Sequence, residues 1–304
     1  MYRRHKPPST ASEHRLRQRT ISAIVIVLAT VIPAFIGGPV FTIGVAALAF
    51  LGIRELLSAM RISGIQPEPW PLYAGALWFV ASAGLGFPTW GIAGGVTALT
   101  LLMLAIPVAH QSTSTGLAEW AHGLAAALYV GLPLAFFVML RGFDGLSERE
   151  WVRNVTGVFG TDSSSLGLAW LGMVIAVTWL NDTAAYLVGR RFGRAKLVPR
   201  LSPGKSRVGA VAGMIAGGMT GVVAVAAFGV PIHWSAAAIS GLVLAATGQI
   251  GDLAESLIKR NLGVKDLGTL IPGHGGILDR IDALLFTVPL AYALAQLAQE
   301  VSWL

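Results

Sequence analysis

Residues 208–229, VGAVAGMIAGGMTGVVAVAAFG, decide the fold class because they form an unbroken apolar run without a charged side chain. A helix needs about 20 mostly apolar residues to cross a bilayer. The run is continuously apolar rather than alternating, which disfavours a strand of a membrane barrel. We therefore interpret this stretch as a transmembrane helix.

Similar apolar stretches lie on both sides of this run, and together they predict nine spans. The others occupy residues 21–36, 41–53, 72–87, 90–109, 118–140, 166–188, 235–251 and 277–304. The second stretch is short, and Gly37, Gly38 and Pro39 separate it tightly from the first, so a re-entrant arrangement stays open for these two. We expect an all-α polytopic membrane protein with about nine transmembrane helices.

The composition agrees with this class and excludes several others. Only 12% of the residues are charged and 54% are hydrophobic, and the mean hydropathy is +0.68. Soluble domains carry about 25% charged residues, so a soluble enzyme, a disordered chain and a coiled coil are excluded. The chain has no cysteine, which excludes disulfide scaffolds, thiolate metal sites and cysteine nucleophiles.

The basic residues predict the orientation of the bundle. They gather in the N-terminal tail and near residues 54–61, 190–207 and 259–265, whereas the predicted outer loops hold only Arg141, Arg149 and Arg153. This asymmetry follows the positive-inside rule. We expect a cytoplasmic N-terminus in a bacterial-type inner or plasma membrane. Because no basic stripe with interleaved aromatic residues is present, the net charge of +7 indicates no nucleic-acid partner.

One membrane domain is the simplest organisation. Residues 1–20 form a basic cytoplasmic tail, which is either attracted to anionic lipid or only a topology signal. Residues 21–165 contain the N-terminal transmembrane helices, and residues 166–304 contain the C-terminal helices that carry the candidate catalytic site.

Ionisable residues are scarce in the N-terminal half, where we interpret them as interfacial or snorkelling groups without a catalytic role. They are Arg54, Glu55, His110, Glu119 and His122.

The C-terminal half contains the first group of candidate residues near residue 182. Asp182, Tyr186 and Arg190 are spaced four apart, which places them along one helix face beside Asn181. A buried polar pair that supports helix packing is the structural alternative.

The second group precedes an apolar helix. Ser202, Lys205 and Ser206 surround a Pro-Gly turn. Backbone N–H groups at a helix start, a lysine and hydroxyls fit a phosphate cradle. The spacing is not that of a Walker A motif, and a turn with a topogenic lysine accounts for the same residues.

The third group is the densest, GDLAESLIKRNLGVKDLGTLIPGHGGILDRID, residues 251–282. Asp279 and Asp282 lie three apart on one helix face, where carboxylates can hold a divalent cation. Glycines permit close backbone approach to a ligand, and basic residues can neutralise phosphate oxygens. This combination is typical of metal-assisted phosphoryl or nucleotidyl transfer.

A purely structural interpretation of this segment must account for ten ionisable groups next to lipid in a charge-poor chain. His274 by itself fits a loop hydrogen bond as well as an acid–base role.

The segment 256–282 resembles the signature of phosphatidate cytidylyltransferases, also called CDP-diacylglycerol synthases. The fixed signature positions are filled by Ser256, Lys259, Arg260, Lys265, Asp266, Gly268, Pro272, His274, Gly275, Gly276, Asp279, Arg280 and Asp282. Two upstream strings are similar to further family patterns: Asn181, Asp182, Ala185, Tyr186, Gly189 and Arg190, and then Ser202, Pro203, Lys205 and Ser206. One departure is Val208 before Gly209, where the family often has glutamate.

The resemblance implies that CTP and phosphatidic acid are the substrates and that CDP-diacylglycerol and pyrophosphate are the products. It also implies a divalent cation, normally Mg²⁺, with the metal count left open. The implied metal ligands are Asp252 and Asp279, with Asp282 nearby. Phosphate binding is assigned to Lys205, Lys259, Arg260 and Arg280, whereas Asn181 and Asp182 orient the lipid headgroup or the metal shell.

The complete set of implied site residues falls into two groups. The catalytic group is Asp252, Lys259, Arg260, Lys265, Asp266, His274, Asp279, Arg280 and Asp282. The substrate-binding group is Asn181, Asp182, Tyr186, Arg190, Ser202, Lys205, Ser206, Ser256, Gly275 and Gly276. The site is expected on the cytoplasmic side of the membrane, where CTP meets membrane lipid, and a homodimer is expected by analogy.

Two other functions stay open from the sequence. In a secondary transporter, Asp182, Asp252, Asp279 and Asp282 would carry protons or cations, although no paired inverted repeats are visible. A related enzyme could instead transfer the cytidylyl group to another lipid phosphate or alcohol.

Overall fold

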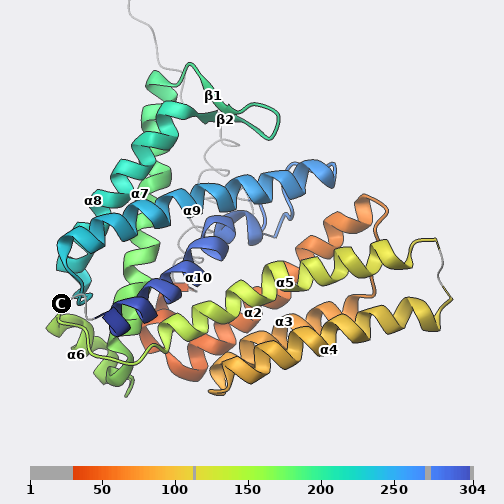
Figure 1. Ribbon diagram of the computed structural model, residues 1–304, viewed down its shortest axis with the longest axis horizontal. Coiled ribbons are helices and arrows are strands. Elements are labelled where there is room, and N and C mark those ends of the chain that lie inside the picture. Colours follow the sequence, from red (N-terminus) through yellow and green to blue (C-terminus); the bar gives the residue numbers. More distant parts are fainter. Residues whose placement is uncertain (1–29, 112–113, 271–274, 302–304) are drawn as a thin grey trace, which may run out of the picture.

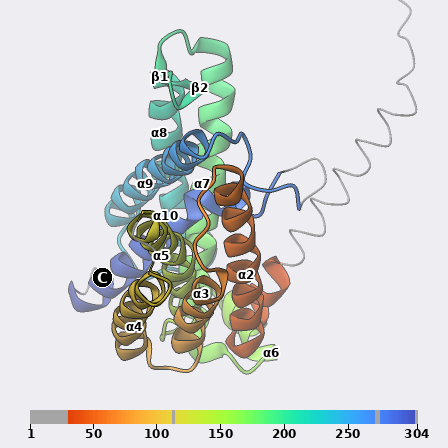
Figure 2. The same ribbon diagram turned by 90° about the vertical axis from the view of Figure 1, so that its right-hand side faces the viewer.

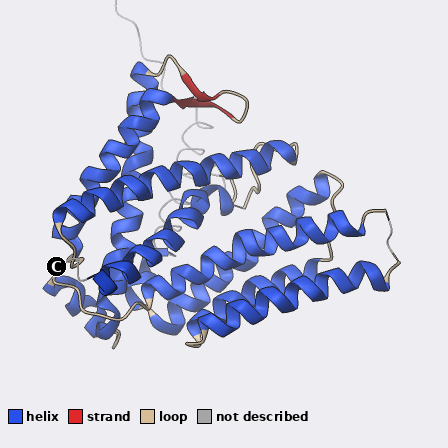
Figure 3. Ribbon diagram, viewed as in Figure 1, coloured by secondary structure: helices blue, strands red, loops and turns tan. Residues whose placement is uncertain are grey.

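The computed structural model describes residues 30–111, 114–270 and 275–301, and these are almost entirely helical (Figure 3). The predicted tail 1–20 and most of the first apolar stretch lie outside the described residues. Residues 30–36 are helical, and the elements that follow are α2 (Gly38–Ile62), α3 (Pro69–Gly84), α4 (Pro88–Ala109), α5 (Gly116–Arg141), α6 (Glu150–Val158), the 3-10 turn η1 (Asp162–Ser164), α7 (Ser165–Phe192), β1 (Lys196–Val198), β2 (Ser202–Ser206), α8 (Arg207–Phe228), α9 (Trp234–Asn261) and α10 (Leu278–Val301).

In the described part of the chain, 7 helices are long and apolar enough to cross a membrane: α2, α4, α5, α7, α8, α9 and α10. The all-α, polytopic fold class is therefore confirmed. The second predicted stretch belongs to a continuous helix of 25 residues rather than a re-entrant segment. The third stretch corresponds to α3, which has only 16 residues. The count of nine spans and the side of the N-terminus stay predictions.

Glycines bring α7, α8 and α9 into close contact (Figure 1). A Cβ added at Gly221 of α8 would overlap the carbonyl oxygen of Ala237 in α9, and one added at Gly209 would lie 2.6 Å from the carbonyl oxygen of Ala185 in α7. Small residues allow membrane helices to approach this closely. The close packing brings polar side chains of α7 and α9 to one end of the three-helix group.

The N-terminal half packs as a second group of helices. Ala76 and Phe79 of α3 and Val130 of α5 are fully buried. A Cβ at Gly131 would lie 2.5 Å from the Cα of Ala76, so α3 and α5 are in close contact. Figure 2 shows α4 on the outside of this group. Only 11% of the most apolar segment of α4 is buried inside the protein.

Helix α10 contacts both groups. Against α9, a Cβ at Gly251 would lie 2.8 Å from the carbonyl oxygen of Asp282. Against α2, a Cβ at Gly52 would lie 3.1 Å from Leu278 Cδ2. Because α10 packs on both helix groups, its first turn lies where the two halves of the chain meet.

The segment 202–206 differs from the loop that the sequence predicts. It is the strand β2, and it pairs antiparallel with β1 in a small hairpin between α7 and α8 (Figure 1). A proline is tolerated in a strand that has a free edge, and Pro203 lies in such a two-stranded sheet. The hairpin carries Lys205 to the end of the helix group.

A glycine substitution tests the close contact between α8 and α9. We expect Gly221→Ala to lower the melting temperature in detergent, because overpacking a filled contact costs about 1–3 kcal/mol. Gly94→Ala in α4 is the matched control, since a Cβ there meets nothing within 4 Å. Equal melting temperatures for the two variants would contradict the packing argument.

Candidate active site

A buried ion cluster joins α9 to α10. Lys259 Nζ of α9 lies 2.9 Å from Glu255 Oε1, one turn earlier, and 2.8 Å from Asp279 Oδ1 of α10. The exposed fractions of the side chains are 14% for Lys259, 0% for Glu255 and 6% for Asp279. Breaking a buried pair by removing one partner typically costs about 3–5 kcal/mol, because a charge is left uncompensated. The cluster therefore fixes the two helices at this point.

Asp279 also shapes the glycine-rich loop before α10. Its Oδ2 accepts hydrogen bonds from the backbone N–H of Gly276 at 2.9 Å and of Leu267 at 3.2 Å. Gly275 has a φ of 85°, a conformation that favours glycine. Both oxygens of Asp279 are thus engaged with Lys259 and with the loop.

Glu55 is the main correction to the sequence analysis, which interprets it as interfacial. The residue lies inside α2, its exposed fraction is 6%, and it contacts the signature loop. Its Oε1 accepts from the Ile277 N–H at 2.9 Å and its Oε2 accepts from the Leu278 N–H at 3.0 Å. The carboxylate therefore caps the first turn of α10. The sequence signal that could have identified Glu55 is the presence of an acidic residue in an apolar stretch. Ionisable residues within membrane segments are costly and are therefore functional candidates.

A second group of charges brings the three sequence motifs together. Lys205 Nζ of β2 lies 2.6 Å from Asp252 Oδ2 of α9. The carboxylates of Asp182 of α7 and Asp282 of α10 lie near enough to Asp252 for the like charges to repel one another. We call these four residues, Asp182, Lys205, Asp252 and Asp282, the Lys205 cluster. It draws on four elements that the sequence could only place separately.

Asp182 is oriented by a hydrogen-bonded amide pair. The buried Asn181 donates from Nδ2 to Asp182 Oδ1 at 2.9 Å and accepts at its Oδ1 from Gln249 Nε2 at 2.8 Å. Gln249 Nε2 also donates to the carbonyl oxygen of Ala210. Gln249 is a polar residue of α9 that the sequence analysis did not single out.

The remaining predicted residues on α7 and the hairpin are placed as follows. Tyr186 and Arg190 are both exposed, and Arg190 Nη1 donates to Tyr186 Oη at 3.5 Å, so the predicted common face is confirmed. Ser206 is buried, and its hydroxyl accepts from the Gly209 N–H as the cap of α8. That N–H is therefore already paired within the protein. Ser202 is half-buried in β2.

The residues around the loop are largely exposed. Arg260 donates to the carbonyl oxygens of Leu201 and Val264. Lys265, Asp266 and Arg280 are exposed, whereas Ser256 is buried. Pro272 and His274 lie outside the described residues, so the acid–base role considered for His274 stays a prediction.

Two buried oxygens near the ion cluster have no hydrogen-bond partner among the described residues. They are Glu255 Oε2 and the hydroxyl of Tyr129 on α5. Unpaired buried polar groups are rare and costly. After Glu55, Tyr129 is thus the second polar side chain of the N-terminal half near the candidate site, and it was not predicted from the sequence.

The predicted three-carboxylate metal site is not formed as a single group. Within the ranges that the structure describes, no three His, Cys, Asp or Glu side chains lie together as metal ligands would. Asp282 and Asp252 lie near each other without a direct contact, whereas Asp279 binds Lys259 and the loop amides. The ligand set Asp252, Asp279 and Asp282 stays a prediction.

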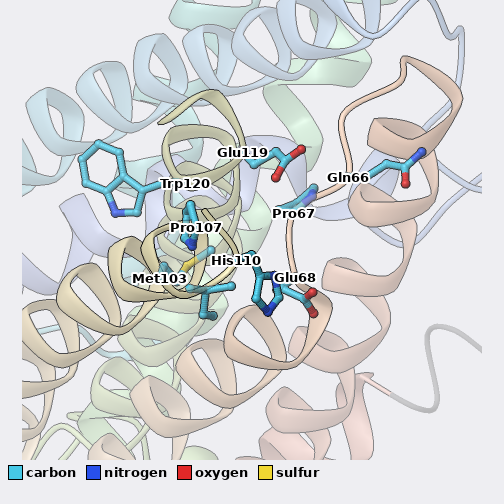
Figure 4. A pocket seen from close by; sticks show the side chains of 9 residues that line it. Gln66, Pro67, Glu68, Met103, Pro107, His110, Glu119 and Trp120 are labelled. Atoms are coloured by element: carbon cyan, nitrogen blue, oxygen red, sulfur yellow. The ribbon is translucent and has the colours of Figure 1, made fainter. Parts of the chain in front are cut away.

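A pocket of about 190 Å³ lies away from these residues, between the α2–α3 turn, the end of α4 and the start of α5 (Figure 4). Its lining includes Glu68, His110, Glu119 and Trp120 but none of the predicted site residues. The interfacial role predicted for His110 and Glu119 stays a prediction.

Comparison with known proteins supports the assignment of the family. The model of the cytidylyltransferase family matches residues 17–298. The chain is 31% identical over 281 residues to the phosphatidate cytidylyltransferase of Synechocystis sp., covering 90% of this chain and 94% of that protein. It is 29% identical over 285 residues to the Bacillus subtilis phosphatidate cytidylyltransferase (93% and 98% covered), and 33% identical over 243 residues to that of Brucella suis (74% and 89% covered). With its three motifs joined at one end of the helices, the chain belongs to the cytidylyltransferase family.

Proposed function

We propose that this protein is a phosphatidate cytidylyltransferase, which converts CTP and phosphatidic acid into CDP-diacylglycerol and pyrophosphate. The observation that carries the proposal is the ion pair between Lys205 of β2 and Asp252 of α9, with the acidic side chains of Asp182 in α7 and Asp282 in α10 nearby. The relatives named above act on phosphatidate by name, and their similarity spans most of this chain. Membership of the family favours an enzyme over the transporter considered from the sequence.

In the proposed reaction, an oxygen of the phosphatidate phosphate attacks the α-phosphorus of CTP. A new P–O bond forms, the bond from the α-phosphorus to the oxygen that bridges to the β-phosphorus breaks, and pyrophosphate leaves. Because two polyanions must meet, neutralisation of charge is the main task of the site. Basic side chains of the three motifs that could take part are Arg190, Lys205, Arg260, Lys265 and Arg280.

Mg²⁺ is part of the proposal, and Asp252 and Asp282 fit it. Each keeps one carboxylate oxygen, Asp252 Oδ1 and Asp282 Oδ2, that accepts no hydrogen bond from the described residues. Mg²⁺ is usually held by one or two carboxylates together with substrate phosphates. When bound, the cation would supply charge neutralisation at the phosphates. Ligation by Asp279 would have to coexist with its bonds to Lys259 and the loop amides.

We further propose that the site faces the cytoplasm and that the protein works as a homodimer. The positive-inside rule supports the orientation, since basic residues gather between α7 and α8 and after α9. In that orientation CTP arrives from water while phosphatidic acid arrives from the bilayer. The dimer rests on the family resemblance, and the mass of the detergent-solubilised protein measured by light scattering tests it.

The reaction is tested with purified protein in mixed micelles, using CTP labelled at its α-phosphate. We expect lipid-soluble label that requires both phosphatidic acid and Mg²⁺. Label that appears with another lipid phosphate or alcohol but not with phosphatidic acid would overturn the proposed substrate. Folded protein that binds no CTP would overturn nucleotidyl transfer.

Removing a proposed metal ligand should abolish turnover without unfolding the protein. We expect Asp282→Asn and Asp252→Asn to lower kcat on the order of 10²-fold or more, because loss of one electrostatic partner of a transition state has effects of that size. The measurement is initial rate across a Mg²⁺ titration. Glu119→Gln, in the pocket of Figure 4, is the matched control and should keep near-full activity. Unchanged Mg²⁺ dependence in both aspartate variants would contradict the assignment.

Lys205 should matter through its charge. We expect Lys205→Met to lower kcat/KM for CTP by about 10-fold to 100-fold, the size of a charge-assisted hydrogen bond of about 1.5–3 kcal/mol. Lys205→Arg should retain more activity because it keeps the charge. Lys196→Met, an exposed position on the paired strand, is the control. If Lys196→Met lost as much activity as Lys205→Met, the effect would belong to the hairpin and not to the cluster.

A further inference from the structure

We propose that Glu55 of α2 is a positioning residue for the transfer reaction, because it fixes the first turn of α10 and with it Asp279 and Asp282. The inference rests on the proposed function, because the reaction that Glu55 would support is the proposed transfer. The contacts of Glu55 do not depend on that function. It makes the N-terminal half of the chain a contributor to the site, although every signature motif lies in the C-terminal half.

The contacts of Glu55 are those of a helix cap supplied from another helix. Its two oxygens accept from the consecutive N–H groups of Ile277 and Leu278, at 2.9 Å and 3.0 Å. The first N–H groups of a helix have no partner within the helix. A carboxylate at this end also interacts favourably with the helix dipole. Glu55 therefore satisfies two donors that α10 cannot satisfy itself.

The loop is shaped to admit this side chain. A Cβ at Gly276 would lie 2.6 Å from Glu55 Oε2, and a Cβ at Gly268 would overlap the Glu55 carboxylate. Gly268 and Gly276 of the signature thus have a structural role that does not involve substrate, because they leave room for the Glu55 side chain of α2. A further contact of α2 with the C-terminal half is the hydrogen bond from Ser63 Oγ, at the end of α2, to the carbonyl oxygen of Leu262, at the end of α9, at 2.6 Å.

The position of α10 matters for both charge groups. Asp279, one residue beyond the capped Leu278, binds Lys259, and Asp282 in the next turn belongs to the Lys205 cluster. A shift of the first turn would displace both aspartates together. Misplacement of about 1 Å at a reacting centre can cost on the order of 10²-fold in rate.

The kinetic test compares Glu55→Ala and Glu55→Gln with Glu68→Gln, which alters an exposed carboxylate at the start of α3. Glutamine keeps one acceptor but turns an N–H₂ group toward a backbone N–H, so it should retain only one of the two bonds. We expect kcat to fall on the order of 10²-fold in Glu55→Ala and less in Glu55→Gln, with smaller changes in KM for CTP. Glu68→Gln should behave as the unmodified protein.

A double-mutant cycle separates positioning from general destabilisation. Gly268→Ala alone should impair activity because the new methyl group meets the Glu55 carboxylate. In the Glu55→Ala background that obstacle is gone, so Gly268→Ala should add little further loss. Additive losses would overturn the proposal, because they would mean that the two residues act independently.

Hydrogen exchange supplies a readout that does not depend on the reaction. Amides 277 and 278 should be protected in the unmodified protein and exchange faster in Glu55→Ala, while the amides of α8 stay unchanged. If the unmodified protein forms no lipid product, the proposed function fails, whereas this loss of protection still supports the cap. Protection that persists in Glu55→Ala, or protection that is lost while kcat stays the same, would overturn the positioning role.

Discussion

The position of Lys259 between Glu255 and Asp279 is the constraint on which the rest of the site depends. One ammonium is shared by two carboxylates in a nearly buried place, so the cluster tolerates little movement of α9 against α10. Asp279 extends that constraint into the loop through the amides of Leu267 and Gly276. The shape of the glycine-rich loop and the distance between two helices are therefore fixed by the same side chain.

Anchoring and chemistry are divided between two neighbouring sets of charges. In the ion cluster, the polar atoms of Lys259 and Asp279 are engaged with other protein groups. In the Lys205 cluster, Lys205 pairs with Asp252, and one carboxylate oxygen each of Asp252 and Asp282 accepts no hydrogen bond from the described residues. Glu255 Oε2 in the ion cluster also has no partner among the described residues, but its side chain is fully buried. The Asp252 side chain is partly exposed and can exchange protein contacts for ligand contacts. The proposed cation and phosphate binding accordingly belong to the second set.

The sequence predicts the helices well because long, continuously apolar runs in a chain with so few charges are typical of membrane-spanning helices. It also identifies Asp252, Lys259 and Asp279, which stand out in a short segment rich in charge. It misses the hairpin, since Pro203 and Gly204 indicate a turn and strand pairing depends on residues 196–198. It misses Glu55 and Tyr129 for a stronger reason. The site residues near them lie far away in the chain, and the local sequence pattern does not show which helices pack together.

The separation of Glu55 from Ile277, 222 residues along the chain, has a consequence for biosynthesis. At 5–20 residues per second, α2 is made about 10–45 seconds before the amides that it will cap. During that interval the acidic group has no native partner, and an ionised carboxylate is expensive among apolar helices. The nascent helix must keep Glu55 neutral or at the water-facing edge until α10 is inserted. A chain truncated before α10 would carry an unsatisfied acid in its core, a defect by which quality-control proteases can recognise it.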